Sequence, residues 1–130
     1  LVVSVCSNFI ADSLRDNSSI LLKFENGSNA VVNYFSNGSK KYSKERLEVY
    51  SQEKTWILDD YVKTYSFSSK NSRIFTSKKD KGHKNILQEY INNIKSIDKP
   101  IIPLDEIINV SKAAIYSVKS FQEKNWIDLN

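Results

Sequence analysis

Short apolar runs separated by turn residues fill the first two thirds of the chain. This spacing is typical of strands joined by tight turns, and its regularity predicts an antiparallel meander. Asn26-Gly27 and Asn37-Gly38 are the clearest turn signals, because both central residues of a type I′ turn need a positive φ. Residues 12–19 are polar and predict a loop. The predicted strands are 1–8, 20–25, 29–36, 45–50, 54–59, 61–67 and 73–77.

A two-residue turn at Asn26-Gly27 would fix the register of the first hairpin. It pairs Leu22 with Val31 and Leu21 with Val32. Both faces of the hairpin then carry apolar side chains, although two helices cover only one. An antiparallel sheet tolerates scattered apolar residues in water, but we favour contact of the uncovered face with a neighbouring domain or a second copy. The side chains predicted for this interface are Leu21, Ala30, Val32 and Tyr34.

From Asp80 onward the apolar residues recur at steps of three and four, the period of an amphipathic helix. Asp80 is the predicted N-cap, and Lys99-Pro100 ends this helix because a residue before proline avoids the α region. A second helix is predicted to begin at Pro103. The apolar stripe of the first helix is Ile86, Leu87, Tyr90, Ile91, Ile94 and Ile97; that of the second is Leu104, Ile107, Ile108, Ser111, Ile115 and Val118, flanked by Ala114 and Phe121.

Residues 126–129 predict a short closing strand after the second helix. The predicted class is therefore α+β: an open, mainly antiparallel meandering sheet with two amphipathic helices packed on one face. The 130 residues, 40% of them hydrophobic, fit one domain with its own core. Because the chain opens with Leu1 instead of a start methionine, we expect it to be an excerpt from a longer protein.

The basic excess says little about partners. There are 19 Lys+Arg against 15 Asp+Glu, and the excess is mostly lysine, accompanied by abundant asparagine and isoleucine. We interpret this as the codon bias of an AT-rich genome. The densest cationic run, residues 78–81, is too short for a nucleic-acid surface. No apolar run approaches the roughly 20 residues that span a bilayer. We expect neither a nucleic-acid partner nor a membrane.

Few residues are available for chemistry. One cysteine, Cys6, and one histidine, His83, exclude a disulfide framework and a Cys/His metal cluster. Three glycines cannot supply a G-x-G-x-x-G phosphate loop, and Asp59 and Asp60 face opposite sides of a strand. We therefore predict no catalytic, cofactor-binding or metal-binding residue here. With no targeting segment visible, the expected location is the reducing cytoplasm.

His83 lies at the start of the first predicted helix. Its ring is in a position to contact an anion held by the free backbone N–H groups of a helix N-terminus. The other interpretation is a histidine that bonds locally at a capped helix start, and spacing alone favours it.

Five short strings follow one another along the chain: LKFENGS at 22–28, SKERLEVY at 43–50, LDDY at 58–61, DKGH at 80–83 and AAIYSVKSF at 113–121. In their order and spacing they resemble the C-terminal domain of the Gfo/Idh/MocA oxidoreductases, the glucose–fructose oxidoreductase and inositol dehydrogenase family. Within that family they are most similar to a branch found in bacterial surface-sugar gene clusters. Two positions depart from the family pattern: Lys124-Asn125 replaces a glycine, and Asn26 replaces a common aspartate.

The resemblance implies one part of a longer NAD(P)-dependent dehydrogenase, acting on a sugar or nucleotide-sugar in polysaccharide biosynthesis. Its partner is an N-terminal Rossmann domain, absent from this chain, which binds NAD or NADP in the full-length enzyme. The open sheet would form a substrate-pocket wall and the interface of a homo-oligomer. The family's catalytic residues match no position here, and this fragment is expected to bind no cofactor. On charge and position, Lys81, His83, Lys44 and Arg46 are candidates to contact an anionic substrate.

Two other functions stay open from the sequence. One is a stand-alone, non-catalytic oligomerisation or interaction domain whose working surface is the free sheet face. The other is a small basic protein that binds nucleic acid, which predicts a steep loss of binding with added salt.

Overall fold

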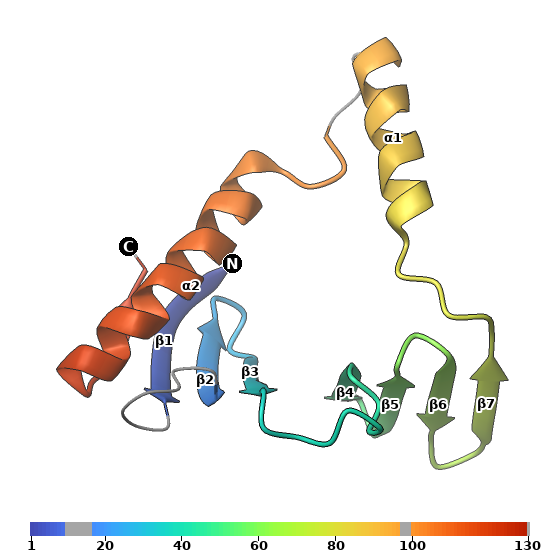
Figure 1. Cartoon of the computed structure of the whole chain (residues 1–130), viewed down its shortest axis with the longest axis horizontal. Helices are drawn as coiled ribbons and strands as arrows, with labels where there is room; N and C mark the ends of the chain where they lie inside the picture. Colours follow the sequence, from blue (N-terminus) through green and yellow to red (C-terminus); the bar gives the residue numbers. More distant parts are fainter. Residues whose placement is uncertain (10–16, 97–99, 130) are drawn as a thin grey trace. The chain divides into compact units, whose positions relative to one another are not determined.

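The computed structural model describes residues 1–9, 17–96 and 100–129. They form two helices and two open four-stranded antiparallel sheets, so the predicted α+β class is confirmed (Figure 1). The chain divides into two compact units. The first unit is residues 1–38 together with 96–130, and the second unit is residues 39–95.

The first unit holds a sheet of strand order β3-β2-β1-β8, which we call the first sheet. The long helix α2 packs on its central strand β1 and on the short β8. The closing strand predicted at 126–129 is present as β8 and pairs Val5 with Ile127. The elements are β1 Val2–Phe9, β2 Asn17–Phe24, β3 Asn29–Phe35, α2 Leu104–Glu123 and β8 Ile127–Asp128.

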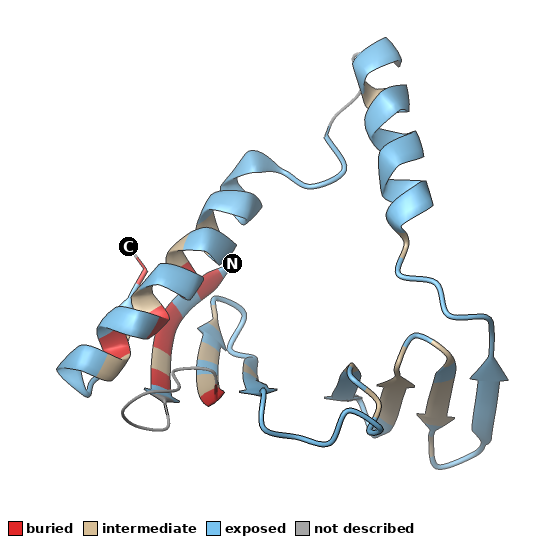
Figure 2. Cartoon of the chain, in the orientation of Figure 1, coloured by how far each residue is buried: buried red, intermediate tan, exposed pale blue. Residues whose placement is uncertain are grey.

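The core of the first unit lies where α2 crosses β1 (Figure 2). Val5 and Ser120 are fully buried, and Ala113 and Ser117 lie on the same helix face. The Ser7 N–H donates to Ser120 Oγ at 3.0 Å, and Ser7 Oγ donates to the carbonyl of Ser117. Small side chains let the helix approach the strand closely, and their hydroxyls satisfy polar groups that the contact removes from water.

This contact corrects the predicted orientation of α2. The large apolar stripe predicted to be buried is exposed: Leu104 is 68% exposed and Ile115 66%. Periodicity identifies the most apolar face of a helix. The face of α2 that packs on β1 instead carries small side chains, two of them with hydroxyls, because it must pair with polar groups along that strand.

One side chain ties α2 to β1, and one backbone conformation ends the helix. Asn109 clamps the start of β1: Val2 N–H donates to Asn109 Oδ1 and Asn109 Nδ2 donates to Val2 O, both at 2.8 Å. At the C-terminal end, Lys124 adopts the left-handed conformation, with φ 53° and ψ 39°, and its N–H donates to Ser120 O. Glycine usually takes this position because it has no Cβ. Pro103 precedes the helix, as predicted.

The predicted type I′ turn at Asn26-Gly27 is wrong, and with it the register of the first hairpin. Only Gly27 has a positive φ, 83°, and its N–H donates to Phe24 O at 2.9 Å. The loop therefore has three residues, ending in a left-handed glycine. The extra loop residue shifts the pairing by one, so that Leu22 lies opposite Ala30 and Leu21 opposite Val31.

The shifted register changes which side chains share a face. Leu22 pairs with Val5, which packs against α2, so Ala30, Val32 and Tyr34 lie on the helix-bearing side of the sheet. Leu21 faces the opposite side. The four residues predicted to form one interface therefore do not lie on a single face.

The second unit is built on a sheet of strand order β4-β5-β6-β7, the second sheet, followed by helix α1. Gln52 and Glu53, both at positive φ, join β4 to β5, and Asp60 and Tyr61 do the same between β5 and β6. None of these four is a glycine, which is why the sequence showed no hairpin signal there. The elements are β4 Arg46–Ser51, β5 Lys54–Asp59, β6 Lys63–Phe67, β7 Ser72–Thr76 and α1 His83–Ser96.

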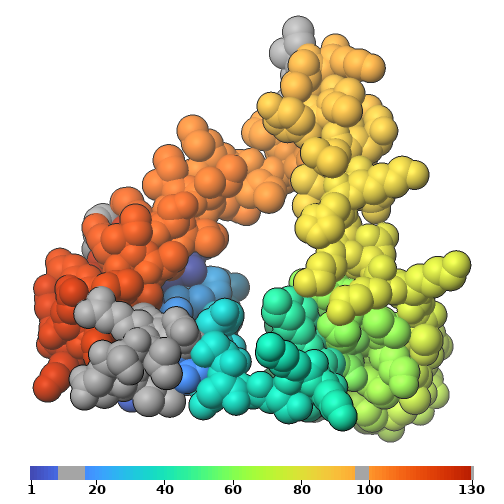
Figure 3. All heavy atoms as spheres, viewed as in Figure 1, coloured from blue at the N-terminus to red at the C-terminus, as the bar shows by residue number. Residues whose placement is uncertain are grey.

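Helix α1 begins later than predicted. The carbonyl of Gly82 accepts the first helical bond, from Ile86 N–H, so Gly82 and not Asp80 is the N-cap. Asp80 Oδ1 instead accepts the Gly82 N–H at 2.8 Å. The predicted end at Lys99, the stripe residue Ile97 and residues 12–16 of the predicted loop lie outside the described part of the chain. The loop prediction is wrong for residues 17–19, which form the start of β2. The rest of the apolar stripe is exposed on the helix (Figure 2). The atoms of α1 are yellow to orange in Figure 3.

Candidate functional site

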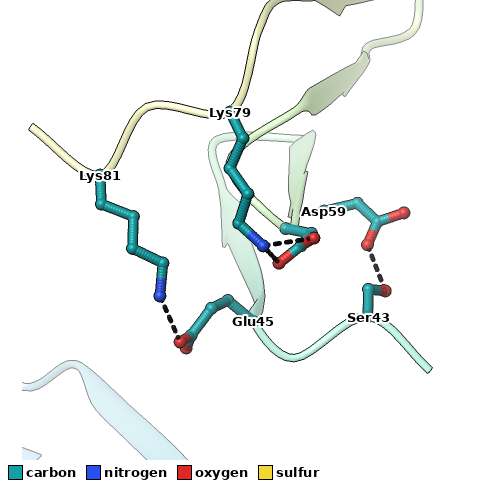
Figure 4. A network of polar contacts seen from close by, with 6 residues as sticks. Ser43, Glu45, Asp59, Lys79 and Lys81 are labelled. Atoms are coloured by element: carbon teal, nitrogen blue, oxygen red, sulfur yellow. Dashed lines mark hydrogen bonds and ion pairs between the residues drawn. The ribbon is translucent and has the colours of Figure 1, made fainter. Parts of the chain in front are cut away.

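The main network of long-range polar contacts in the second unit lies where the segment before α1 passes the ends of β4 and β5 (Figure 4). We call this segment, residues 77–82, the strap. The Lys79 ammonium lies 2.7 Å from both carboxylate oxygens of Asp60. Two residues later, Lys81 Nζ lies 3.1 Å from Glu45 Oε1. Two consecutive cations of the strap therefore hold two different carboxylates of the sheet.

The turn that receives the strap has an unusual backbone. Asp60 and Tyr61 have φ values of 50° and 58°, in the left-handed region that bulky residues rarely adopt. The Lys81 ammonium lies 5.5 Å from the centroid of the Tyr61 ring, within cation–π range. Lys81 thus contacts both an acidic group and an aromatic ring.

The remaining carboxylate of the network belongs to Asp59, which accepts a hydrogen bond from Ser43 Oγ at 2.7 Å. With Lys79 and Lys81 facing Glu45, Asp59 and Asp60, the network has one more carboxylate than cation. Its free lone pairs accept hydrogen bonds, and such a network suits hydroxyl-bearing groups better than anions.

A second polar group lies along β4, where Arg46, Glu48 and Tyr50 alternate onto one face. Arg46 Nε lies 2.7 Å and the Tyr50 hydroxyl 2.5 Å from the Glu48 carboxylate. The hydrogen bond from Tyr50, then that from Arg46, lowers the pKa of Glu48 below its ordinary value. Glu48 in turn raises the pKa of Arg46 and of Tyr50. The Arg46 charge is thus neutralised by its own strand.

The first unit has a groove of about 480 Å³ on its sheet, lined mostly by β2, β3 and the hairpin between them. Trp126 borders it, and the Lys23 ammonium lies 4.2 Å from the centroid of that ring. Leu21 and Ala30, two of the predicted interface residues, are among its lining. The groove is open and mainly apolar, and it contains no cluster of titratable groups among the described residues.

Residues 1–9, 17–96 and 100–129 contain neither a cluster of metal-ligand side chains nor a helix that could span a membrane. No three His, Cys, Asp or Glu side chains gather there as metal ligands would. No described helix is long and apolar enough to cross a membrane.

Comparison with known proteins gives a fold. No family model matches the sequence, and neither does any curated protein. An oxidoreductase from Agrobacterium radiobacter, solved with NAD+, L-tartaric acid and magnesium, superposes with a TM-score of 0.82 at 12% identity, over 98% of this chain and 43% of that one. Levoglucosan dehydrogenase, solved with NADH and levoglucosan, superposes with a TM-score of 0.79 at 13% identity, over 98% of this chain and 44% of that one. A protein assigned as a myo-inositol dehydrogenase from Sinorhizobium meliloti has a TM-score of 0.73 at 16% identity, over 100% of this chain and 44% of that one.

This chain has the fold of a part of each of these solved oxidoreductases. It spans less than half the length of the solved proteins that it matches. The resemblance stated from the five sequence strings is thereby confirmed at the level of the fold, although identity to each of these structures is 16% or lower.

The structure brings the predicted substrate residues into one neighbourhood. Lys81 pairs with Glu45, which lies between Lys44 and Arg46 in sequence. Lys44 forms no ion pair with another described residue, and His83 is the exposed first residue of α1. Lys81 and Arg46, by contrast, are both engaged by carboxylates of their own chain.

Glu45, Asp60 and Lys79 are the members of this network that sequence reasoning missed. Each partnership depends on the strap passing the ends of β4 and β5, and no local motif encodes such a contact. Asp59 and Asp60, predicted not to share a substrate, have separate partners in the chain, Ser43 and Lys79.

Proposed function

We propose that this chain is the C-terminal, non-catalytic part of an NAD(P)-dependent oxidoreductase that acts on a sugar or nucleotide-sugar, in the Gfo/Idh/MocA family. The observation that carries the proposal is the match of 98% of this chain to 43% of an oxidoreductase solved with NAD+. The five ordered sequence strings support it independently. In this proposal, residues 1–130 act as a single domain of a longer cytoplasmic enzyme used in bacterial surface-polysaccharide synthesis.

The dinucleotide belongs to another part of that enzyme. A dinucleotide site of the Rossmann type needs a parallel strand, a Gly-rich turn and a helix N-terminus that receives the pyrophosphate. Both sheets are antiparallel, and α1 follows the strap, not a strand. The described residues therefore lack the elements of a Rossmann-type site, and we propose that the dinucleotide binds to the part of the enzyme outside this chain.

This chain would supply surface to the complete enzyme. The apolar stripes of α1 and α2 are exposed, and burial of such stripes against a second domain is the usual source of association free energy. Tyr90 and Ile94 on α1, and Leu104 and Ile115 on α2, are among the most exposed apolar side chains. We propose that the Rossmann domain covers part of this surface.

We propose that the four predicted residues contact the substrate, and their present contacts show which of them are free to do so. Lys44 and His83 are available as they stand, whereas Lys81 and Arg46 must leave Glu45 and Glu48 before they pair with an anion. We propose that Lys81 and His83 bound one wall of the sugar pocket.

Steady-state kinetics of the longer protein that carries this chain tests the function. The expected result is reduction of NAD+ or NADP+ with a member of a panel of sugars and nucleotide-sugars. The paired variant Lys81→Ala/His83→Ala should raise KM with a smaller effect on turnover, while the matched control Lys70→Ala, in the exposed turn after β6, should leave both unchanged. No dinucleotide-dependent activity and no dinucleotide binding would overturn the function. Unchanged constants in the paired variant would overturn only the pocket wall.

The second candidate is an oligomerisation or interaction domain. It is favoured by the apolar side chains on both faces of the β2–β3 hairpin, where Leu21 and Val31 lie on one side and Val32 and Tyr34 on the other. Light scattering tests this role. The expected result is a mass that rises with concentration, and a constant mass of about 15.0 kDa for the chain would argue against an interface.

A further inference from the structure

The position of α1 within the second unit depends on the strap. Helix α2 packs on β1 in the first unit, but among the described residues α1 has no comparable packing on β4–β7. The strap, residues 77–82, is the covalent link between β7 and α1. Whatever fixes the strap therefore fixes the direction in which α1 leaves the second sheet.

The strap is fixed at three successive points. Ser77 N–H donates to the carbonyl of Val62 at 2.9 Å, which continues the pairing of β7 with β6. Lys79 then binds Asp60 with both carboxylate oxygens at 2.7 Å, and Lys81 binds Glu45 at 3.1 Å. Figure 4 shows the two lysines reaching from the strap to different carboxylates.

A hinge follows immediately. Gly82 has a φ of 75°, a conformation that L side chains avoid, and its carbonyl caps α1. Asp80 Oδ1 accepts the Gly82 N–H at 2.8 Å. The change of direction into the helix thus falls directly after the last ion pair.

The second sheet contains an internal comparison for the turn that holds the strap. Gln52-Glu53 and Asp60-Tyr61 are both non-glycine turns at positive φ. At Asp60-Tyr61, the carboxylate pairs with Lys79 and the ring lies beside Lys81. Strained residues persist where surrounding contacts over-determine them, and the strap lysines supply those contacts here.

We propose that Lys79–Asp60 and Lys81–Glu45 form a salt-sensitive latch that sets the exit direction of α1. When the latch is closed, the hinge at Gly82 presents the apolar stripe of α1 in one direction. When it opens, the helix turns about Gly82. Side chains of both pairs are between 25% and 47% exposed, so added salt screens them and favours the open state. Lys81 belongs both to the latch and to the proposed pocket wall, but the ion pairs of the latch form without dinucleotide or sugar, so the latch can be tested without either.

Hydrogen–deuterium exchange of the protein that carries this chain tests the latch. The reporters are the amides of Ser77, Gly82 and Ile86, whose acceptors lie within or beside the strap. The variant Glu45→Gln/Asp60→Asn keeps side-chain size and removes both charges. We expect exchange at these amides to quicken about fivefold, the size that two exposed ion pairs allow. In the unmodified protein, a rise in salt should produce the same change.

The matched control is Glu48→Gln, which removes an ion pair of similar exposure that lies within β4 and does not involve the strap. It should leave the three reporters unchanged. The swap Lys79→Asp/Asp60→Lys reverses one pair and should restore slow exchange relative to Lys79→Asp alone. The latch would be overturned if the three amides exchanged at the same rate in the double variant, the control and the unmodified protein. It would also be overturned if their exchange rates did not change with salt.

Discussion

The two units contain similar elements, a four-stranded antiparallel sheet and an amphipathic helix, yet only the first unit has a core. Every described residue that is buried belongs to the first unit, where α2 packs on β1. In the described residues of the second unit no side chain is buried, and the stripe of α1 is exposed.

The difference lies in the helix faces and not in the strength of the apolar pattern. Helix α2 contacts its sheet through Ala113, Ser117 and Ser120, a face that looks weak in the sequence. Helix α1 has a clear stripe of isoleucine, leucine and tyrosine and packs on no strand in this way. The core of the first unit forms because α2 approaches β1 closely and the polar groups at the contact are hydrogen-bonded. The second unit depends on turns, ion pairs and whatever covers its apolar surfaces.

The largest effect is expected from Ser120→Leu in the α2–β1 contact. The larger side chain has no room at a fully buried position, and the Ser7 N–H loses its acceptor. Overpacking and an unsatisfied buried donor together should lower the free energy of unfolding by about 3 kcal/mol. Denaturant unfolding measures the change. Ser111→Leu, the same substitution at an exposed position of α2, is the control and should shift it by less than about 0.5 kcal/mol. Equal effects would mean that the core is not at this contact.

A smaller loss is expected from Asn109→Ala, which removes the clamp on β1. The N–H and the carbonyl of Val2 lose partners at 2.8 Å in a partly buried location. The cost should be about 2 kcal/mol in the unfolding free energy. Asn85→Ala, on the exposed surface of α1, is the matched change in the second unit and should be nearly neutral. If both substitutions cost the same, the clamp contributes nothing to the difference between the units.

The sequence predicted the elements well but not the helix face or the hairpin register. Strand positions follow from alternation and turn residues, and β5 begins and ends where the pattern placed it. The face of α2 did not follow, because periodicity ranks faces by apolarity, whereas Ser117 and Ser120 are selected by polar groups of β1. The Asn26-Gly27 signal predicted a turn correctly but not its length, since one left-handed glycine serves a three-residue loop equally well.

A stabilising change is expected at Lys124, in the first unit. This lysine has a φ of 53° at the end of α2. Lys124-Asn125 is also where the family that the sequence resembles has a glycine. Lys124→Gly should raise the unfolding free energy by about 0.5–1 kcal/mol, because it relieves a left-handed side chain. Thermal unfolding measures it. Lys119→Gly, within the same helix, is the control and should destabilise by about 1 kcal/mol. A destabilising Lys124→Gly would mean that the lysine side chain contributes more than its backbone strain costs.

The candidate site was less predictable than the fold. Charge and position selected Lys81 and Arg46 as free cations, but the structure pairs both with carboxylates. Arg46 and Glu48 are two residues apart, so the strand period alone places them on one face, and that contact was open to prediction. The contact between Lys81 and Glu45 depends on how the strap crosses the sheet, and neither composition nor local spacing contains that information.

The smallest effect concerns the pH dependence of the second unit. The pKa of Glu48 is lowered mainly by the Tyr50 hydroxyl, so its contribution to stability is present above the ordinary carboxyl pKa and is lost as pH falls through the lowered value. Tyr50→Phe should raise the pKa of Glu48, as followed by NMR titration, and shift the loss of stability to higher pH. Tyr65→Phe, on β6 of the same sheet, is the control. An unchanged Glu48 titration in Tyr50→Phe would mean that Arg46 alone sets the charge of this strand.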